Sequence, residues 1–186
     1  MRRIVSHLLV TLDGVVKLDA VLDTIKHLRG EGVEEDFHAA LAQEDAMLLG
    51  RTTYQEWAGY WPTSDCQPFA DHINGVPKHV ASRSLRDVPW GDIGNASLLD
   101  GDFVDAINAL KRQPGGNIGV HGSPSLVESL LHAGLLDELR LEIYPVLAGT
   151  GERFFRNGPS RRLRLVGTKD TGNGVVILRY GPANES

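Results

Sequence analysis

The chain has 186 residues, of which 41% are hydrophobic and 23% are charged, with a net charge of -5 and a pI of about 5.8. This length can bury a substantial core, so we expect one domain over residues 1–186. The acidic balance disfavours nucleic acid and anionic membrane surfaces as partners, because both require a basic field, and the single Cys66 excludes an intrachain disulfide.

No apolar run approaches the length of a membrane span. The N-terminal stretch MRRIVSHLLV is interrupted by Ser6 and His7 and lacks a small-residue cleavage site, which favours a first strand over a signal peptide. We therefore expect a cytoplasmic protein.

In chain order, the first two thirds alternate between strand and helix signals. Short apolar runs predict strands, and apolar residues at helical spacing predict helices. The predicted strands are 3–10, Ala46–Leu49, Pro77–Ser82, Ala96–Leu99 and Asn117–Val120. The predicted helices are a turn at Thr24–Leu28 within the loop Leu12–Gly32, then Glu34–Gln43, Thr52–Trp57, Pro68–Asn74, Asp102–Lys111 and Ser123–His132.

The last third has a different character. Glu138–Pro145, Arg161–Gly167 and Val175–Tyr180 alternate as half-buried strands do, with a turn at Asn173-Gly174 before the last of them. The whole pattern predicts an α/β domain of three layers, α/β/α, with a mostly parallel central sheet and antiparallel C-terminal strands.

Three predicted strand-to-helix turns have a common composition. Each is rich in hydroxyl residues, and two carry an arginine; they are Gly50–Thr53, Ser82–Ser84 and Gly122–Ser125. The carboxyl ends of parallel strands line the ligand crevice, and helix N-termini and arginines both bind phosphate. These turns therefore suit a ligand with several phosphates, although each is also compatible with ordinary helix capping. The GxGxxG fingerprint is absent, because the nearby glycines fall at 116, 119 and 122.

Longer stretches resemble a known family. LLGRTTYQEW resembles the Gly-Arg-x-Thr turn of dihydrofolate reductases, and VTLDGVV resembles the Ser-Leu-Asp-Gly start of the riboflavin-biosynthesis reductase domain, with Thr11 in place of serine. GLLDELRLEIYPVLAGTGERFF is similar to that domain's Leu-Asp-Glu-Leu, Pro-Val-Leu and Gly-x-Gly-x-x-Phe run. The resemblance extends from Ile4 to Tyr180 and implies a dihydrofolate-reductase-like fold in stand-alone form, without the deaminase domain to which such reductases are often fused.

The resemblance implies NADPH as the hydride donor. By position, the first turn would hold the pyrophosphate region, and the second would face the adenosine, where Arg83 would select NADPH over NADH. The third turn would wrap the middle of the cofactor, and the backbone of Val10 would face the nicotinamide. The implied cofactor residues are Val10, Gly50, Arg51, Thr52, Thr53, Ser82, Arg83, Ser84, Gly122, Ser123, Pro124, Ser125 and Leu126.

The same resemblance implies a carboxylate that manages substrate protonation. Counting back from Gly50 places Glu34 at the corresponding position, although Glu34 could also belong to the acidic first turn of a surface helix. Asp13 is the second catalytic candidate, and the alternative for it is a turn-forming Asp-Gly pair.

His121 and Arg153 are the candidate substrate-binding residues. His121 stands where riboflavin reductases tend to have a glutamate, and it could either titrate near the substrate or lie at the surface. Trp57, Tyr60 and Trp61 could stack on a flat ring, but core packing or a subunit contact is the commoner role of such aromatics. The histidine spacing predicts no metal site.

Together these features predict an NADPH-dependent reductase that transfers hydride to a flat heterocycle, either pterin-like or the aminouracil precursor of riboflavin, and that forms a homodimer. A nucleotide-binding module of the same fold without turnover is the main alternative. A purely structural dimer that uses the aromatic cluster is a third.

Overall fold

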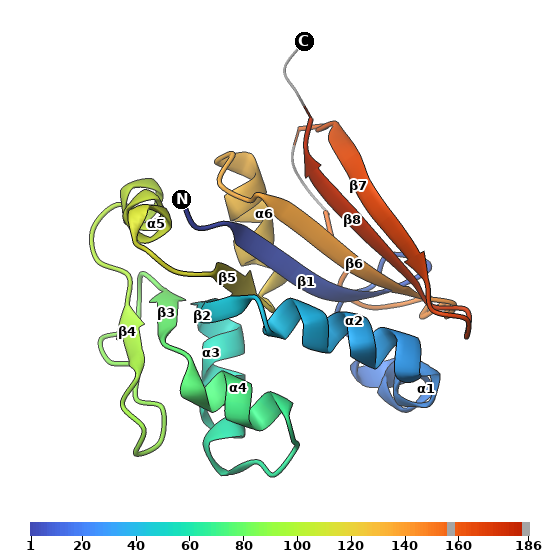
Figure 1. Ribbon diagram of the computed structural model, residues 1–186, viewed down its shortest axis with the longest axis horizontal. Coiled ribbons are helices and arrows are strands. Elements are labelled where there is room, and N and C mark those ends of the chain that lie inside the picture. The colour runs from blue at the N-terminus through green and yellow to red at the C-terminus, as the bar shows by residue number, and fades with distance from the viewer. Residues whose placement is uncertain (156–158, 184–186) are drawn as a thin grey trace.

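A single mixed sheet runs through the molecule (Figure 1). The computed structural model describes residues 1–155 and 159–183. The strand order is β4-β3-β2-β5-β1-β6-β8-β7; all pairings from β4 to β6 are parallel, and those of β8 with β6 and β7 are antiparallel. The strands are β1 (Ile4–Thr11), β2 (Glu44–Gly50), β3 (Lys78–Ala81), β4 (Ala96–Leu98), β5 (Asn117–Val120), β6 (Glu138–Tyr144), β7 (Leu163–Asp170) and β8 (Val176–Pro182).

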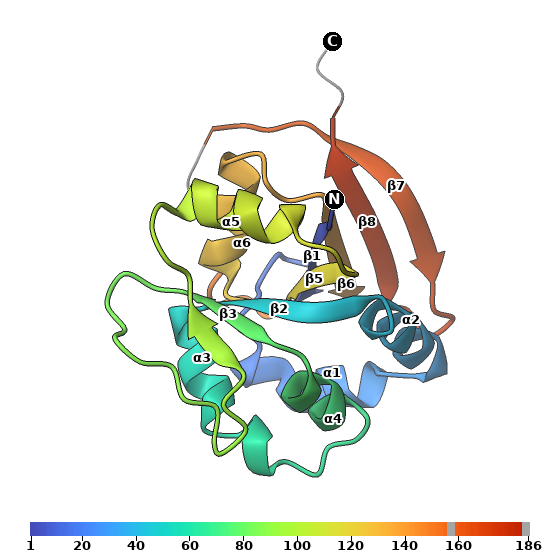
Figure 2. The ribbon, with the colours of Figure 1, turned by 60° about the vertical axis from the view of Figure 1, so that its left-hand side comes forward.

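Helices cover both faces of the sheet, which confirms the predicted three layers (Figure 2). One face carries α1 (Leu22–Leu28), α2 (Glu31–Leu41), α3 (Arg51–Ala58) and α4 (Phe69–Gly75). The other carries α5 (Phe103–Arg112) and α6 (Pro124–His132). Two 3-10 turns, η1 (Asp19–Val21) and η2 (Trp61–Thr63), complete the described elements. Among these helices, none is both long and apolar enough to cross a membrane.

The face under α5 and α6 forms the main apolar core. Alternate residues of β1, including Ile4, Leu8 and Val10, are at most 5% exposed and pack against the inner side of α6. The apolar stripe of α6 consists of Leu126, Val127, Leu130 and Leu131. Burial of this stripe is the main force that holds α6 against the sheet.

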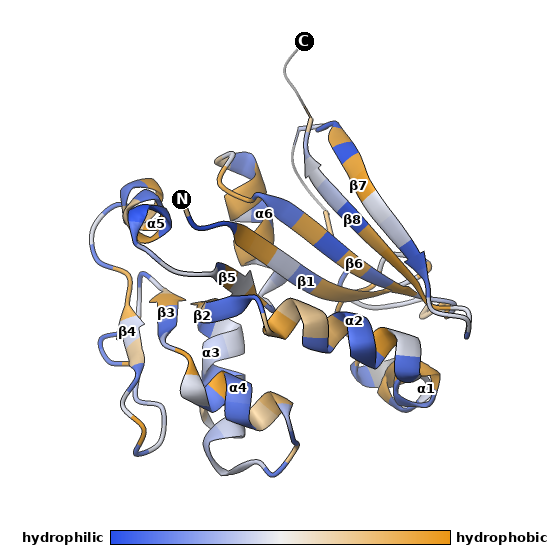
Figure 3. Ribbon diagram, in the orientation of Figure 1, coloured by the Kyte–Doolittle hydropathy of each residue, from blue (hydrophilic) through white to orange (hydrophobic). Residues whose placement is uncertain are grey.

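The opposite face of β1 and β6 is polar but also buried. On β6, Glu138 and Arg140 are 7% exposed, and Glu142 and Tyr144 are inaccessible to solvent. The alternation of polar and apolar residues along this strand is visible in Figure 3. The prediction of a half-buried β6 is therefore wrong, because α2 covers the face that the pattern assigned to solvent.

The sheet has a switch point between β1 and β5. The chain leaves β1 on the side of α1 to α4 and leaves β5 on the side of α6. The two strands pair only from Ile4 with Ile118 to Ser6 with Val120, so the carboxyl half of β1 has β6 as its neighbour but not β5. In open α/β sheets, ligands bind at such a point, beyond the carboxyl ends of the strands.

Candidate functional site

The three predicted turns meet at the carboxyl edge of the sheet. A Cβ on Gly50 would lie 2.3 Å from the Oγ of Ser123, and a Cβ on Gly122 would lie 2.9 Å from the Oγ1 of Thr53. The Nη1 of Arg51 donates to the Oγ of Ser84 over 3.5 Å. Segments that are 33 to about 70 residues apart in the sequence thus form one surface.

Two helices begin at this surface, one from each side of the sheet. The N-cap residues are Gly50 for α3 and Ser123 for α6, and neither helix has a side-chain hydrogen bond at its cap. At α5, by contrast, the Asp102 carboxylate accepts from the N–H groups of Val104 and Asp105. The uncapped N–H groups and the positive dipole ends of α3 and α6 suit an anion such as a pyrophosphate.

Glycines let the turns approach one another closely, and arginines give the surface a positive charge. A Cβ at Gly50 or Gly122 would displace the hydroxyl of Ser123 or Thr53 that faces it. Arg51 and Arg83 are exposed beside the turns, where each guanidinium can contact phosphate oxygens. Thr52, Ser82 and Pro124 complete the three turns. The residues present therefore fit a dinucleotide.

Two predicted cofactor residues belong to the core. The side chains of Val10 and Leu126 are 5% and 6% exposed and pack in the apolar cluster under α6. The N–H of Leu126 already donates to the carbonyl of Ser123 at 2.9 Å. Only backbone groups of these two residues could therefore face a cofactor.

Asp13 fixes a loop. Its carboxylate accepts hydrogen bonds from the Oγ1 of Thr11 (2.7 Å) and from the N–H groups of Ala148 (3.0 Å) and Gly149 (2.9 Å). The hydrogen bond from Thr11, followed by that from Ala148, lowers the pKa of Asp13 to about 2. A carboxyl group with this pKa is ionised near neutrality, so the geometry favours the alternative reading of Asp13, a turn residue, over a proton donor.

Arg153 is part of the same loop structure. Its Nε donates to the backbone carbonyl of Asp13 at 3.1 Å, and its Nη2 lies 3.6 Å from the carboxylate. The side chain remains 49% exposed. These contacts account for Arg153 without a substrate, and its predicted binding role stays a prediction.

Glu34 lies in the first turn of α2, which begins at Glu31, three residues before the predicted start. Its Oε1 accepts from the Nε of Arg29 at 2.6 Å, and its side chain is 41% exposed. The guanidinium of Arg29 lies 5.0 Å from the ring centroid of Phe37. An ion pair with Arg29 thus holds Glu34 at the N-terminal end of α2, in the position expected of an acidic first-turn residue.

His121 is a predicted polar residue whose side chain is enclosed at this edge. It follows β5, precedes the third turn, and is 6% exposed. Its Nε2 donates to the Oε2 of Glu44 at 2.8 Å. Burial alone would raise the pKa of Glu44, but the charge and hydrogen bond of His121, with further contributions from His72 and His7, lower it to about 2.

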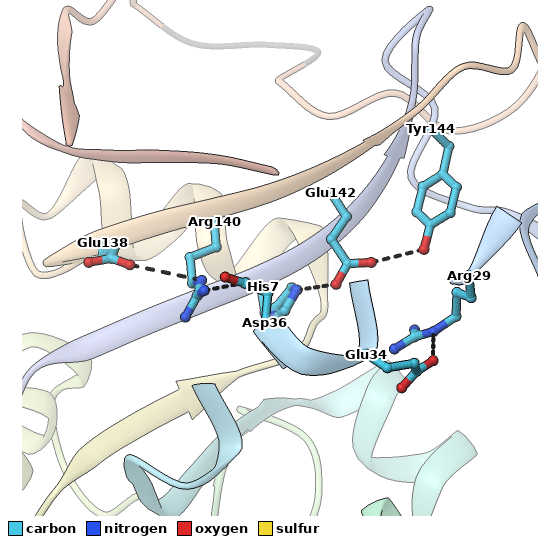
Figure 4. A network of polar contacts seen from close by, with 8 residues as sticks. All are labelled: His7, Arg29, Glu34, Asp36, Glu138, Arg140, Glu142 and Tyr144. Atoms are coloured by element: carbon cyan, nitrogen blue, oxygen red, sulfur yellow. Dashed lines mark hydrogen bonds and ion pairs between the residues drawn. The ribbon is translucent and has the colours of Figure 1, made fainter. Parts of the chain in front are cut away.

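A second buried carboxylate lies on β6 (Figure 4). The Oε1 of Glu142 accepts from the Nε2 of His7 at 2.5 Å, and the Oε2 accepts from the hydroxyl of Tyr144 at 2.9 Å. Burial opposes its ionisation, but the hydrogen bond and charge of His7, aided by Arg29, hold the pKa of Glu142 below its ordinary value. Burial, followed by the charge of Glu142, raises the pKa of Tyr144 well above its usual range.

Sequence reasoning missed this polar layer. Glu44, Glu142 and His7 were not among the predicted site residues, although each is at most 7% exposed. The available signal was the spacing in ELRLEIY, where every second residue is polar on a strand that follows a helical crossover. A parallel strand in that position is covered on both faces, so its polar residues must be buried with partners.

The three aromatic residues of the predicted cluster, Tyr60, Trp61 and Trp57, differ in exposure and in the rings that they contact. Tyr60 is 56% exposed and packs edge-on against Trp61. Trp57 contacts Trp61 at a ring-centroid distance of 5.8 Å and His121 at 6.1 Å. Only Trp57 therefore reaches the site. Within residues 1–155 and 159–183, no cluster of three His, Cys, Asp or Glu side chains is arranged to hold a metal ion.

Comparison with known proteins finds relatives of similar length and fold. The chain is 29% identical to the uncharacterised Bacillus subtilis protein YyaP over 96% of this chain and 94% of that protein. A Shewanella sp. PV-4 protein assigned to riboflavin biosynthesis superposes with a TM-score of 0.80 at 21% identity, covering 99% and 100% of the two chains.

More distant structures share the same fold. A Thermotoga maritima diaminohydroxyphosphoribosylaminopyrimidine deaminase/5-amino-6-(5-phosphoribosylamino)uracil reductase matches with a TM-score of 0.67 at 14% identity, over 98% of this chain and 57% of that one. Enterococcus faecalis dihydrofolate reductase, complexed with NADP(H), matches with a TM-score of 0.60 at 16% identity, over 98% and 97%. Residues 2–177 match the RibD C-terminal domain family. The chain therefore belongs to the RibD C-terminal domain family and has the dihydrofolate-reductase-like fold that its motifs predicted.

Proposed function

We propose that this protein is an NADPH-dependent reductase that transfers hydride to a conjugated heterocycle. The observation that carries the proposal is the convergence of the three turns, with Gly50 against Ser123 and Gly122 against Thr53, at the switch point of the sheet. This arrangement offers two helix N-termini and two arginines to one dinucleotide. Members of the same family and fold include proteins named as reductases.

Two observations support the choice of substrate class, one from a structural neighbour and one from the site. The name of the Thermotoga maritima neighbour specifies an aminouracil ribotide, which is a flat, hydrogen-bonding ring with a sugar phosphate. In this chain, the rings of Phe37, Trp57 and Phe69 lie beside the turns, and His121 lies among them. Aromatic walls with a few polar groups suit a planar heterocycle.

The cofactor, when bound, supplies the hydride. The protein residues then bind and orient it: α3 and α6 hold the phosphates, and Arg83 contacts the adenosine end. The α2–α4 side of the site places polar and aromatic groups around the substrate and limits the access of water. On this side, His121 directly precedes the third turn and offers a polar ring among the aromatic side chains.

Calorimetric titration with NADPH and NADH tests the proposal. We expect wild type to bind NADPH more tightly than NADH, and Arg83→Ala to lose that preference. Arg86→Ala is the matched control, since Arg86 is also exposed and lies just beyond the second turn. NADPH that fails to bind wild type at millimolar concentration would refute the proposal.

A nucleotide-binding module without turnover is the second candidate. The observation that favours it is that both predicted catalytic carboxylates are engaged elsewhere, Asp13 with backbone N–H groups and Glu34 with Arg29. Oxidation of NADPH in the presence of the aminouracil ribotide or a dihydropterin distinguishes the two. Tight binding with no oxidation of NADPH would support the module.

A further inference from the structure

His121 is built into the edge of the sheet next to the cofactor turns. Because it directly precedes Gly122, its backbone is continuous with the third turn. Its side chain projects to the same face as Gly119, where rings from three helices surround it. The ring-centroid distances from His121 are 6.1 Å to Phe37 of α2, 6.1 Å to Trp57 of α3 and 5.8 Å to Phe69 of α4.

Glu44 reaches His121 across the neighbouring strand. Its carboxylate starts from the first residue of β2 and passes over Gly119, where a Cβ would lie only 2.1 Å from Oε2. The side chain of Glu44 is 2% exposed, and Oε2 accepts from the Nε2 of His121 at 2.8 Å. The absence of a side chain at Gly119 therefore makes room for the hydrogen bond between Glu44 and His121. This bond holds the imidazole of His121 through its Nε2 atom.

The other ring nitrogen remains available. Among the described residues, the Nδ1 of His121 has no hydrogen-bond partner. We propose that Nδ1 of His121 exchanges a proton with the substrate and that Glu44 is its positioning residue. This inference rests on the proposed reductase function and assigns the proton donor within it.

The chemistry balances with these groups. Hydride adds to the carbon of a substrate C=N or C=O bond, and the π electrons move to the heteroatom. The heteroatom takes the proton from Nδ1 of the imidazolium. This leaves a neutral imidazole whose Nε2–H still donates to Glu44, and water later returns the proton.

Other titratable groups face this imidazole. The ring of His7, from β1, lies 6.0 Å from that of His121, and the Nε2 of His72, from α4, lies 3.8 Å from the same oxygen of Glu44. Helices α2 and α3 present the aromatic rings of Phe37 and Trp57. The guanidinium of Arg29 lies over the ring of Phe37, 5.0 Å from its centroid. The pH dependence of kcat therefore reflects His121 together with these neighbours. A second measurement that observes His121 alone is needed beside it.

The kinetic experiment uses NADPH and 5-amino-6-(5-phosphoribosylamino)uracil across pH 5–9. We expect Glu44→Gln and His121→Asn to lower kcat by about 100-fold and to alter the pH profile, while the Kd for NADPH stays within about twofold. Glu138→Gln is the matched control, because Glu138 is also a buried carboxylate, paired with Arg3, and it does not contact His121. An unchanged kcat and pH profile in Glu44→Gln and His121→Asn would overturn the inference.

A spectroscopic experiment separates this inference from the proposed function. In long-range ¹H–¹⁵N spectra of wild type above pH 8, we expect neutral His121 to carry its proton on Nε2, and Glu44→Gln to lose this preference. An Nδ1–H tautomer in wild type would overturn the inference even if NADPH binds. If NADPH binds without turnover, movement of the Nδ1 resonance on adding the ribotide supports the inference, and no movement overturns it. Failure of NADPH to bind refutes the proposed function alone.

Discussion

Gly119 shows how one residue without a side chain can determine a site. The carboxylate of Glu44 occupies the space that a Cβ would take, and its Cδ lies 2.4 Å from that position. The glycine is not required by backbone conformation, because its φ is not in the left-handed region. Its role is to let a buried carboxylate cross β5.

We therefore expect Gly119→Ala to destabilise the fold by overpacking, by about 1–3 kcal/mol, as measured by urea unfolding. Gly75→Ala is the control, because no atom lies within 4 Å of a Cβ at Gly75 and the last turn of a helix tolerates alanine. Equal unfolding free energies for the two variants would show that Glu44 can move without cost.

Asp13 gives the fold a dependence on pH. Its pKa falls from the ordinary 3.8 to about 2 because Thr11 and the backbone N–H groups stabilise the ionised form in the folded state. The folded pKa is the lower one, so this stabilisation is present above about pH 4 and is lost as pH falls toward 2.

Asp13→Asn should lower the melting temperature at pH 7 and flatten its decline between pH 4 and pH 2. Asp65→Asn, which changes an exposed aspartate, should behave as wild type. Thermal melts at each pH measure both effects. A decline equally steep in Asp13→Asn would assign the acid sensitivity to other carboxyl groups.

At the scale of elements, α2 is held to the sheet by charges as well as by apolar contacts. Asp36 forms an ion pair with Arg140 of β6, and both side chains are largely buried, at 16% and 9% exposure. The adjacent Glu35 instead pairs with Lys169 at 3.7 Å, where both side chains are exposed. Two neighbouring acids on one helix thus form one buried and one exposed ion pair.

Asp36→Ala should cost about 3 kcal/mol of unfolding free energy, because it leaves the Arg140 cation buried with only a distant partner in Glu138. Glu35→Ala should change stability by at most about 0.5 kcal/mol. Chemical denaturation compares the two, and hydrogen exchange should show faster opening of α2 in Asp36→Ala. Equal costs would mean that solvent reaches Arg140.

The sequence allowed most elements to be predicted, since periodicity depends on local burial. The helices and the parallel strands were found within a few residues, and α5 began at the expected Asp102 cap. The burial of the polar face of β6 was not predicted, because the alternation of polar and apolar residues does not say what covers each face of the strand. That information depends on where α2 lies, which is a property of the tertiary structure.

At the scale of the whole molecule, the sequence predicted the three strand-to-helix turns but not the buried polar partners around them. The turns carry local signals, a glycine or hydroxyl residue at a strand end, and their meeting follows from the parallel sheet. Glu44 and His121 lie 77 residues apart, and their contact depends on the order of β2 and β5 in the sheet and on the absence of a side chain at Gly119. No local pattern reports such a contact.

The two helices that would hold the dinucleotide come from opposite layers, so their spacing is a property of the entire fold. The spacing of the two helices depends on the close approach of Gly50 to Ser123. Among the described glycines, the one other close approach between the starts of α3 and α6 is that of Gly122 to Thr53. Gly50 has an ordinary extended backbone, with φ of -76°, so alanine is locally acceptable there. A methyl group would meet the Oγ of Ser123 and press the two turns apart unless that hydroxyl rotates away.

We therefore expect Gly50→Ala to weaken NADPH binding by about tenfold, equivalent to about 1.4 kcal/mol, in calorimetric titration. Adding Ser123→Gly to that variant removes the opposing Oγ and should restore most of the affinity. Gly59→Ala, at the other end of α3, is the control, since the nearest atoms to its Cβ would lie at 3.8 Å. If Gly50→Ala binds as tightly as wild type, the spacing of the helices does not set the affinity. If the double variant binds no better than Gly50→Ala, the effect arises from Gly50 alone and not from its contact with Ser123.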